Sequence, residues 1–117
     1  MAKRTRAPIP VRKEGKVTVK QGWKFNEFFG AWKPYKHWML THLPTGMAVA
    51  GKPFRTLEDA GRAANFLAQV DWSFWYGDDV PEECFKLRED CEKHLLYSTT
   101  FSCFVWKETA SDNVEDA

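Results

Sequence analysis

Three cysteines and a histidine in the C-terminal half are the first candidates for metal chemistry. They are Cys84, Cys91, His94 and Cys103, and thiolates and imidazoles are ligands that zinc prefers. The surrounding pattern predicts a continuous helix, in which Cys84 and Cys91 lie two turns apart, about 10 Å along the axis. Because a zinc–sulfur bond is only about 2.3 Å long, these two cysteines cannot share one ion. The other three residues lack a Cys-x-x-Cys pair, so we expect no metal site and no cofactor.

Nucleophilic catalysis is the second chemistry to consider, because three histidines accompany the cysteines. None of these residues occurs in a nucleophile elbow or in a glycine-flanked turn. His37 and His42 lie five positions apart in an expected strand, so their side chains point to opposite faces and cannot act together. The chain also contains no glycine-rich phosphate loop. The sequence therefore predicts a protein that is not an enzyme.

Basic and aromatic residues interleaved in the N-terminal half are suited to binding a polyanion. Rings can stack on unpaired bases, and cations can contact phosphates. The candidates for phosphate contact are Arg4, Arg6, Arg12, Lys13, Lys24, Lys33 and Lys36, and the candidate stacking residues are Trp23, Trp32 and Trp38. We expect these side chains to contact DNA or RNA, largely through the phosphate backbone. The same rings would equally serve as core residues, with the lysines on the solvent side.

The charge of the chain divides sharply between its two halves. The whole chain has a formal net charge of +1. Residues 1–57 hold twelve Lys and Arg against two acids, and residues 58–117 hold five against fourteen. This separation predicts a basic surface for nucleic acid, or two opposed patches through which a homodimer forms. Mutual neutralisation of the two halves on folding is the third interpretation.

Length and composition restrict the class of protein. A chain of 117 residues is long enough for one domain with a hydrophobic core. Its 44% hydrophobic and 28% charged residues are usual for soluble globular proteins, whereas 15% aromatic residues is a high share. No run approaches the roughly 18 apolar residues that span a bilayer. Because no apolar segment follows the basic N-terminus and the cysteine number is odd, we expect a cytoplasmic protein with reduced thiols and no membrane contact.

The elements that position these residues predict a single α+β domain over residues 17–107. Residues 1–16, which contain two prolines and no periodicity, predict a flexible basic arm, and residues 108–117 predict an acidic tail. One or two short strands are expected over residues 17–29. Further strands are expected over residues 37–42, 47–50 and 97–106, with a turn at 43–46.

Two helices are expected to cover one face of an antiparallel sheet of about four strands. Thr56 is the expected cap of the first helix, whose small apolar residues recur at helical spacing. Asp79 is the expected cap of the second helix, with Pro81 in the first turn and Glu82 completing a capping box.

The run from His37 to Ala68 resembles the ethylene-response-factor DNA-binding domain of plants and related integrase arm modules. The likeness lies in a hairpin followed by Phe54-Arg55-Thr56-Leu57-Glu58-Asp59-Ala60, and it covers about a quarter of the chain. In that family a hairpin leads into a Phe-x-Thr-x-Glu-x-Ala helix start. The resemblance implies a three-stranded sheet lying in the major groove of DNA. The family's arginine-rich first strand is absent here, so Lys24, Lys33, Lys36 and Arg55 would take its place.

An inhibitor that binds a partner protein is the alternative function. In general character the chain resembles small phage-encoded inhibitors of host enzymes, including anti-CRISPR and anti-restriction proteins. The partner surface would consist of Trp72, Phe74, Trp75 and Tyr76, because aromatic anchors dominate interface energetics. The same run would equally form a corner of the core. Acids of the second helix would mimic phosphates in a basic groove; these are Glu82, Glu83, Glu89, Asp90 and Glu92.

Overall fold

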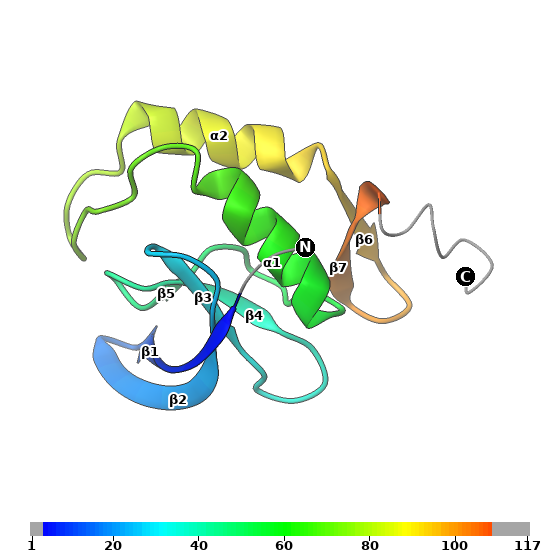
Figure 1. The fold of residues 1–117 in the computed structure, drawn as a ribbon, viewed down its shortest axis with the longest axis horizontal. Coiled ribbons are helices and arrows are strands. Elements are labelled where there is room, and N and C mark those ends of the chain that lie inside the picture. Colours follow the sequence, from blue (N-terminus) through cyan, green and yellow to red (C-terminus); the bar gives the residue numbers. More distant parts are fainter. Residues whose placement is uncertain (1–3, 109–117) are drawn as a thin grey trace.

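Helix α1 (Leu57–Leu67) lies between a five-stranded antiparallel sheet and helix α2 (Glu82–Glu92) (Figure 1). The structure is a computed structural model that describes residues 4–108. The sheet has the order β1-β2-β3-β4-β5, and β6 pairs with β7 in a separate two-stranded sheet. The strands are β1 Thr5–Lys13, β2 Lys16–Lys24, β3 Phe29–Trp32, β4 Met39–His42, β5 Met47–Ala48, β6 Leu95–Ser98 and β7 Cys103–Trp106. The α+β class is confirmed, with more strands than the four expected.

Strand β1 corrects the prediction of a flexible arm over residues 1–16. Every residue of β1 has a partner in β2. The two strands are joined by Glu14 and Gly15, which both have positive φ, as in the two-residue turns that match the twist of a hairpin. Ile9, at the centre of β1, is fully buried. The basic side chains of this segment are therefore held on a strand that belongs to the sheet.

Two prolines inside β1 were the reason why the sequence predicted a flexible arm instead of a strand. The amide of Arg12 donates to the carbonyl of Gly46, outside the β1–β2 pair, at 2.8 Å. Amides at alternate positions of a strand point to the same side. Pro8 and Pro10 are separated from Arg12 by an even number of positions, so their backbone nitrogens point to the same side as the Arg12 amide. The N–H groups that the prolines lack would therefore point away from β2. No hydrogen bond between β1 and β2 is lost, so the strand accommodates both prolines.

The sheet curls so that β1 contacts β5, its opposite end. Two glycines permit this curvature. A Cβ atom added to Gly22 or to Gly30 would lie 2.7 Å from a side-chain carbon of Ile9. Since neither glycine has a side chain, Ile9 packs directly on the backbone of β2 and β3.

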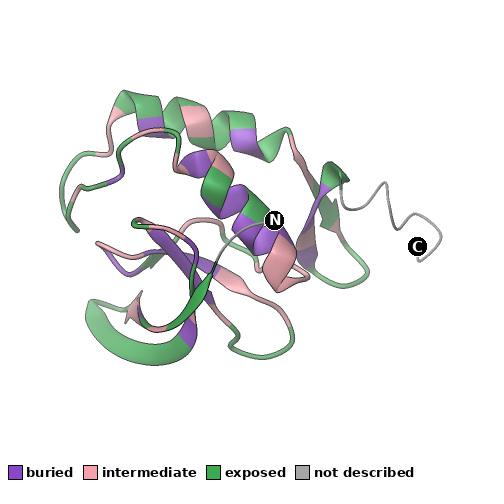
Figure 2. Cartoon of the chain, viewed as in Figure 1, coloured by how far each residue is buried: buried purple, intermediate pink, exposed green. Residues whose placement is uncertain are grey.

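The other face of β3 and β4 packs against α1. The register places Phe29 opposite His42 and Ala31 opposite Leu40, and all four side chains are buried. Buried stretches of ribbon appear in the sheet and in α1 (Figure 2). The buried residues of α1 are Asp59, Ala60, Gly61, Ala63, Ala64 and Leu67. Because most of them are small, the helix approaches the sheet closely, as the helical spacing predicted.

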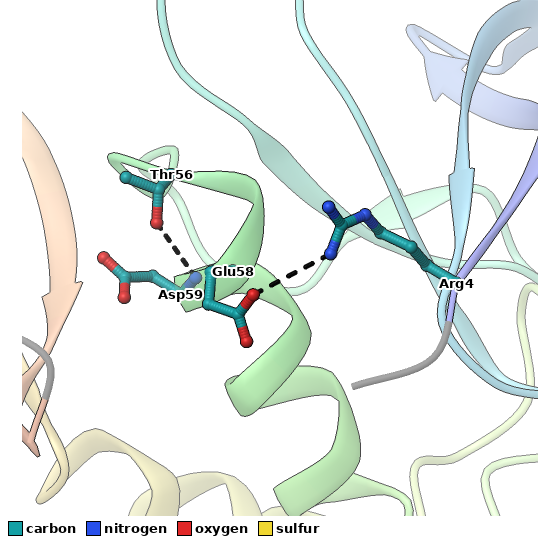
Figure 3. Close-up of polar contacts among 4 residues, drawn as sticks. All are labelled: Arg4, Thr56, Glu58 and Asp59. Carbon is teal, nitrogen blue, oxygen red and sulfur yellow. Dashed lines mark hydrogen bonds and ion pairs between the residues drawn. The ribbon is translucent and has the colours of Figure 1, made fainter. Parts of the chain in front are cut away.

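The cap predicted for α1 is confirmed, whereas that of α2 is wrong. Thr56 Oγ1 accepts a hydrogen bond from the amide of Asp59 at 3.0 Å (Figure 3). Helix α2 begins directly after Pro81, and no side chain of the described residues caps it. Asp79 lies two positions before Pro81, too early in the chain to occupy the cap position.

Residues 97–106, predicted as one strand, belong instead to the β6–β7 hairpin with a turn at 99–102. The turn interrupts a stretch rich in aromatic and β-branched residues, whose composition alone predicts one continuous strand. Phe54 connects the two sheets, because it forms bridges with Trp38 and with Phe104.

The predicted acidic tail over residues 108–117 lies outside the described residues, except for Glu108. Within residues 4–108 no helix is long and apolar enough to cross a bilayer.

Candidate nucleic-acid interface

Strands β1 and β2 and helix α2 carry opposite net charges and lie on different sides of α1. Strands β1 and β2 carry six Lys and Arg and no acid. Helix α2 carries five acids and lies on the other side of α1 from the β1–β2 hairpin (Figure 1). The separation of charge along the sequence is therefore a separation in space, between the sheet and α2.

The cations of the sheet are largely free of internal carboxylate partners. Within residues 4–108, the pair between Arg4 Nη1 and Glu58 Oε1, at 3.8 Å, is the only ion pair that uses a base preceding Glu58 (Figure 3). The exposed bases of the sheet and its loops include Arg6, Lys13, Lys16, Lys20, Lys24, Lys33 and Lys36. Among the residues 4–108 that the structure describes, these exposed bases therefore form no ion pair with the acids of the second half.

Trp23 lies within a small arginine cluster. The guanidinium carbons of Arg4 and Arg6 lie 5.6 and 5.1 Å from its ring centroid, within cation–π distance. Arg6 and Trp23 are direct partners in the β1–β2 register. The cluster thus unites three of the residues predicted to contact nucleic acid.

Trp32 and Trp38 lie beside different cations. The Nζ atom of Lys20 lies 5.6 Å from the ring centroid of Trp32, and that of Lys33 lies 5.5 Å from Trp38. Trp32 is opposite Gly22 in the register, so it lies on the opposite sheet face from Trp23. The predicted stacking residues therefore do not share one surface.

Arg12 is separated from the other predicted contact residues. Its Nε donates to the carbonyl of Thr45 at 2.9 Å, and its guanidinium carbon lies 3.9 Å from the ring centroid of Tyr76. Both contacts hold this half-buried side chain against neighbouring loops. We therefore assign Arg12 a structural part, unlike the exposed Lys13, Lys24 and Lys36.

Lys16 and Lys20 belong to the same basic strand, although the sequence analysis did not select them. Lys16, Lys20 and Lys24 lie four residues apart in β2, so all three side chains lie on one face of that strand. A lysine at every fourth position from Lys16 to Lys24 was the sequence signal that could have identified them.

His42 attaches the aromatic segment 72–76 to the sheet. Its Nε2 donates to the carbonyl of Trp72 at 2.6 Å, and its Nδ1 accepts from Thr45 Oγ1 at 2.8 Å. A carbonyl only accepts hydrogen bonds, which fixes the proton on Nε2. Burial lowers the pKa of His42 below its ordinary value, which favours this neutral form.

Trp72 and Phe74 are packed residues rather than exposed anchors for a partner. Trp72 is 5% exposed, and its Nε1 donates to the carbonyl of Leu67 at 2.6 Å. The ring of Phe74 stacks on His42 with 4.5 Å between centroids. For these two residues the core interpretation is therefore correct.

Trp75 and Tyr76 instead line an open groove beside α2. They are 70% and 54% exposed, and Phe85 of α2 and Met47 of β5 are similarly exposed on the same groove. The groove has a volume of about 310 Å³ and a mostly apolar lining. An exposed apolar surface of this kind is suited to contact with another apolar group.

The acids of α2 that were predicted to mimic phosphates are all exposed: Glu82, Glu83, Glu89, Asp90 and Glu92. Glu82 and Glu89 lie three residues before and four residues after Phe85, so they share its helix face. The charged residue that α2 contributes to the groove lining is instead Arg88.

The three cysteines are buried thiols within the packed interior. Cys84 Sγ donates to the carbonyl of Asp71 at 3.3 Å. Burial raises the pKa of all three, and it raises that of Cys91 to about 12. In the part of the chain that the structure describes, no three His, Cys, Asp or Glu side chains gather into a group suited to a metal ion.

Comparisons with protein-family models, with curated proteins and with solved structures find no match for this chain. The resemblance of residues 37–68 to the ethylene-response-factor domain stays a prediction.

Proposed function

We propose that this protein binds nucleic acid through the basic side of its five-stranded sheet. The separation of charge in space carries this proposal: β1 and β2 carry six bases and no acid, and α2 lies beyond α1. Four of the six bases, Lys13, Lys16, Lys20 and Lys24, lie on one face of the sheet. Most of the cations of β1 and β2 are exposed, and within the described residues they form no ion pair with a carboxylate. Their charges are therefore available to attract phosphate. Phosphates would supply the negative charge that the chain does not place there.

Contact with the phosphate backbone is favoured over reading of base sequence. The exposed cations of β2 are lysines, which act as flexible point charges rather than as planar bidentate groups. Such contacts fix the position of a protein on nucleic acid but carry no sequence information. We therefore expect little preference among sequences and a strong dependence on salt.

The test measures the affinity of the full chain for a labelled oligonucleotide by fluorescence anisotropy, between about 50 and 200 mM salt. The Lys20→Ala, Lys24→Ala double variant removes two charges from β2, and Lys86→Ala, Lys93→Ala removes two from α2 and its C-cap. We expect only the first to weaken binding. Absence of binding at low salt, or equal effects of the two variants, would contradict the proposal.

Binding of a partner protein is the second candidate function, as for an inhibitor of a host enzyme. It is favoured by the groove around Trp75, Tyr76 and Phe85, whose apolar side chains are more than half exposed. The lining is mostly apolar, with Asp78 and Arg88 as its charged residues, and so suits an apolar segment of a partner. A photoactivatable residue at position 75 should then form a crosslink to one protein in cells, and the Phe85→Ala change should abolish that crosslink.

A further inference from the structure

Two aromatic side chains that contribute little to the core meet at a second hollow. Tyr35, in the loop before β4, is 81% exposed, and Phe101, in the turn between β6 and β7, is 59% exposed. Both line a hollow of about 270 Å³ together with Pro34, His37 and Pro53. Large rings at a hollow of this kind mark a surface suited to a ligand more often than isolated exposed rings do.

The described residues that line this hollow include one base, Lys36, and no acid. Residues 28–57 contain four Lys and Arg and no Asp or Glu, and residues 93–107 contain two lysines and no acid. Lys36 itself lines the hollow, and its Nζ lies 5.6 Å from the ring centroid of Tyr35. The ligand that complements such a site is aromatic and carries negative charge.

His37 adds a polar group to the hollow. Its Nδ1 is buried and has no hydrogen-bond partner within the described residues. A buried polar atom without a partner is costly, so a turn of the His37 ring toward the edge of a bound nucleobase would relieve that cost.

The size of the hollow limits what it can hold. A volume of about 270 Å³ is slightly below the range of about 300–1,000 Å³ of pockets for drug-sized ligands. One flat base fits such a hollow while its sugar and phosphates remain outside, beside the lysines. Bases in a duplex are stacked and paired, so only an unpaired base can enter.

We propose that the nucleic acid bound by this protein is single-stranded, and that one unpaired base stacks in the hollow between Tyr35 and Phe101. This inference rests on the proposed function, and it names the form of the ligand and a stacking site beside Lys36.

The experiment measures the affinity of the full chain for an unstructured single-stranded oligonucleotide and for a duplex of matched length. Loss of one stacking ring weakens single-strand binding by about 5-fold or more. We expect this for Tyr35→Ala and for Phe101→Ala, with unchanged affinity for the duplex. Tyr35→Phe, which keeps the ring, should bind as the unaltered protein does. Trp75→Ala is the matched control, because it removes an equally exposed ring from the other groove.

A fluorescent base analogue in the single strand gives an independent measurement, since stacking on a ring quenches its emission. Quenching that depends on Tyr35 supports the inference. Single-strand binding that is unaffected by both alanine changes, or tighter binding to the duplex, would overturn it while the proposed function stands. If neither oligonucleotide binds at low salt, the proposed function itself fails.

Discussion

The Nε2 atom of His42 lies 2.6 Å from the carbonyl oxygen of Trp72 and donates a hydrogen bond to it. This bond joins β4 to the segment that follows α1. Trp72 is buried, whereas Trp75, three residues later, is exposed on the groove beside α2. The position of the groove wall therefore depends on a buried and neutral imidazole.

We expect the protein to lose stability as the pH falls from about 7 to about 5, because of His42. Burial lowers the pKa of His42 in the folded state. The unfolded chain therefore binds the proton more readily, and protonation favours unfolding. The loss begins as the pH falls through the ordinary histidine pKa and is complete below the lowered one. Denaturant unfolding at several pH values measures it.

The control for this prediction is His42→Gln, which should be less stable at neutral pH but should show a flatter dependence on pH. An unchanged pH dependence in His42→Gln would show that another group is responsible.

The Gly22→Ala change should destabilise the fold by about 1–3 kcal/mol, the usual cost of overpacking. A Cβ at Gly22 would meet the carbonyl oxygen of Ala31 and would lie 2.7 Å from a side-chain carbon of Ile9. At Gly51 a Cβ meets nothing within 4 Å. Gly51→Ala should therefore change the free energy of unfolding by no more than about 0.5 kcal/mol. Equal effects of the two substitutions in urea unfolding would be inconsistent with the close packing of Ile9.

The salt dependence of oligonucleotide binding should be reduced by the Lys20→Ala, Lys24→Ala double variant. Each lost phosphate contact lowers the slope of log affinity against log salt by about 0.7–0.9. Two contacts therefore lower it by about 1.5. The Lys86→Ala, Lys93→Ala control should leave the slope unchanged, because those lysines lie beside acids at the α2 end of the molecule. A slope that does not distinguish the two variants would place the contact elsewhere.

The three thiols should be almost unreactive in the folded protein. Cys84, Cys91 and Cys103 are buried with raised pKa values, so little reactive thiolate is present at about pH 8. A thiol-reactive chromogenic disulfide should titrate all three in denaturant and react only slowly without it. A fast reaction of one thiol in native buffer would indicate local opening of the α2 region.

The sequence predicted those features that depend on neighbouring residues. Thr56 caps α1 as expected, because a threonine followed by acids and small apolar residues is a local signal for a helix start. The prolines of β1, by contrast, led to a wrong prediction of a flexible arm. Their effect depends on which side of the strand is unpaired, and only the partner strand determines that side.

Contacts between distant segments could not be predicted from the sequence. The division of residues 72–76 into buried and exposed rings depends on His42, thirty residues away in the chain. Tyr35 and Phe101 lie farther apart still, yet they line one hollow. No local sequence pattern predicts that these two rings line one hollow, because their positions depend on how the two sheets pack around Phe54.

The outer side of β1 has a consequence for the behaviour of this protein at high concentration. An edge strand with free amides is a template on which another molecule can add a strand, and this is a route to aggregates. Pro8 and Pro10 have no amide hydrogen, and the amide of Arg12 is bonded to Gly46. Three successive donor positions along that edge are thus closed to a neighbouring molecule, which protects the sheet from growing by intermolecular pairing.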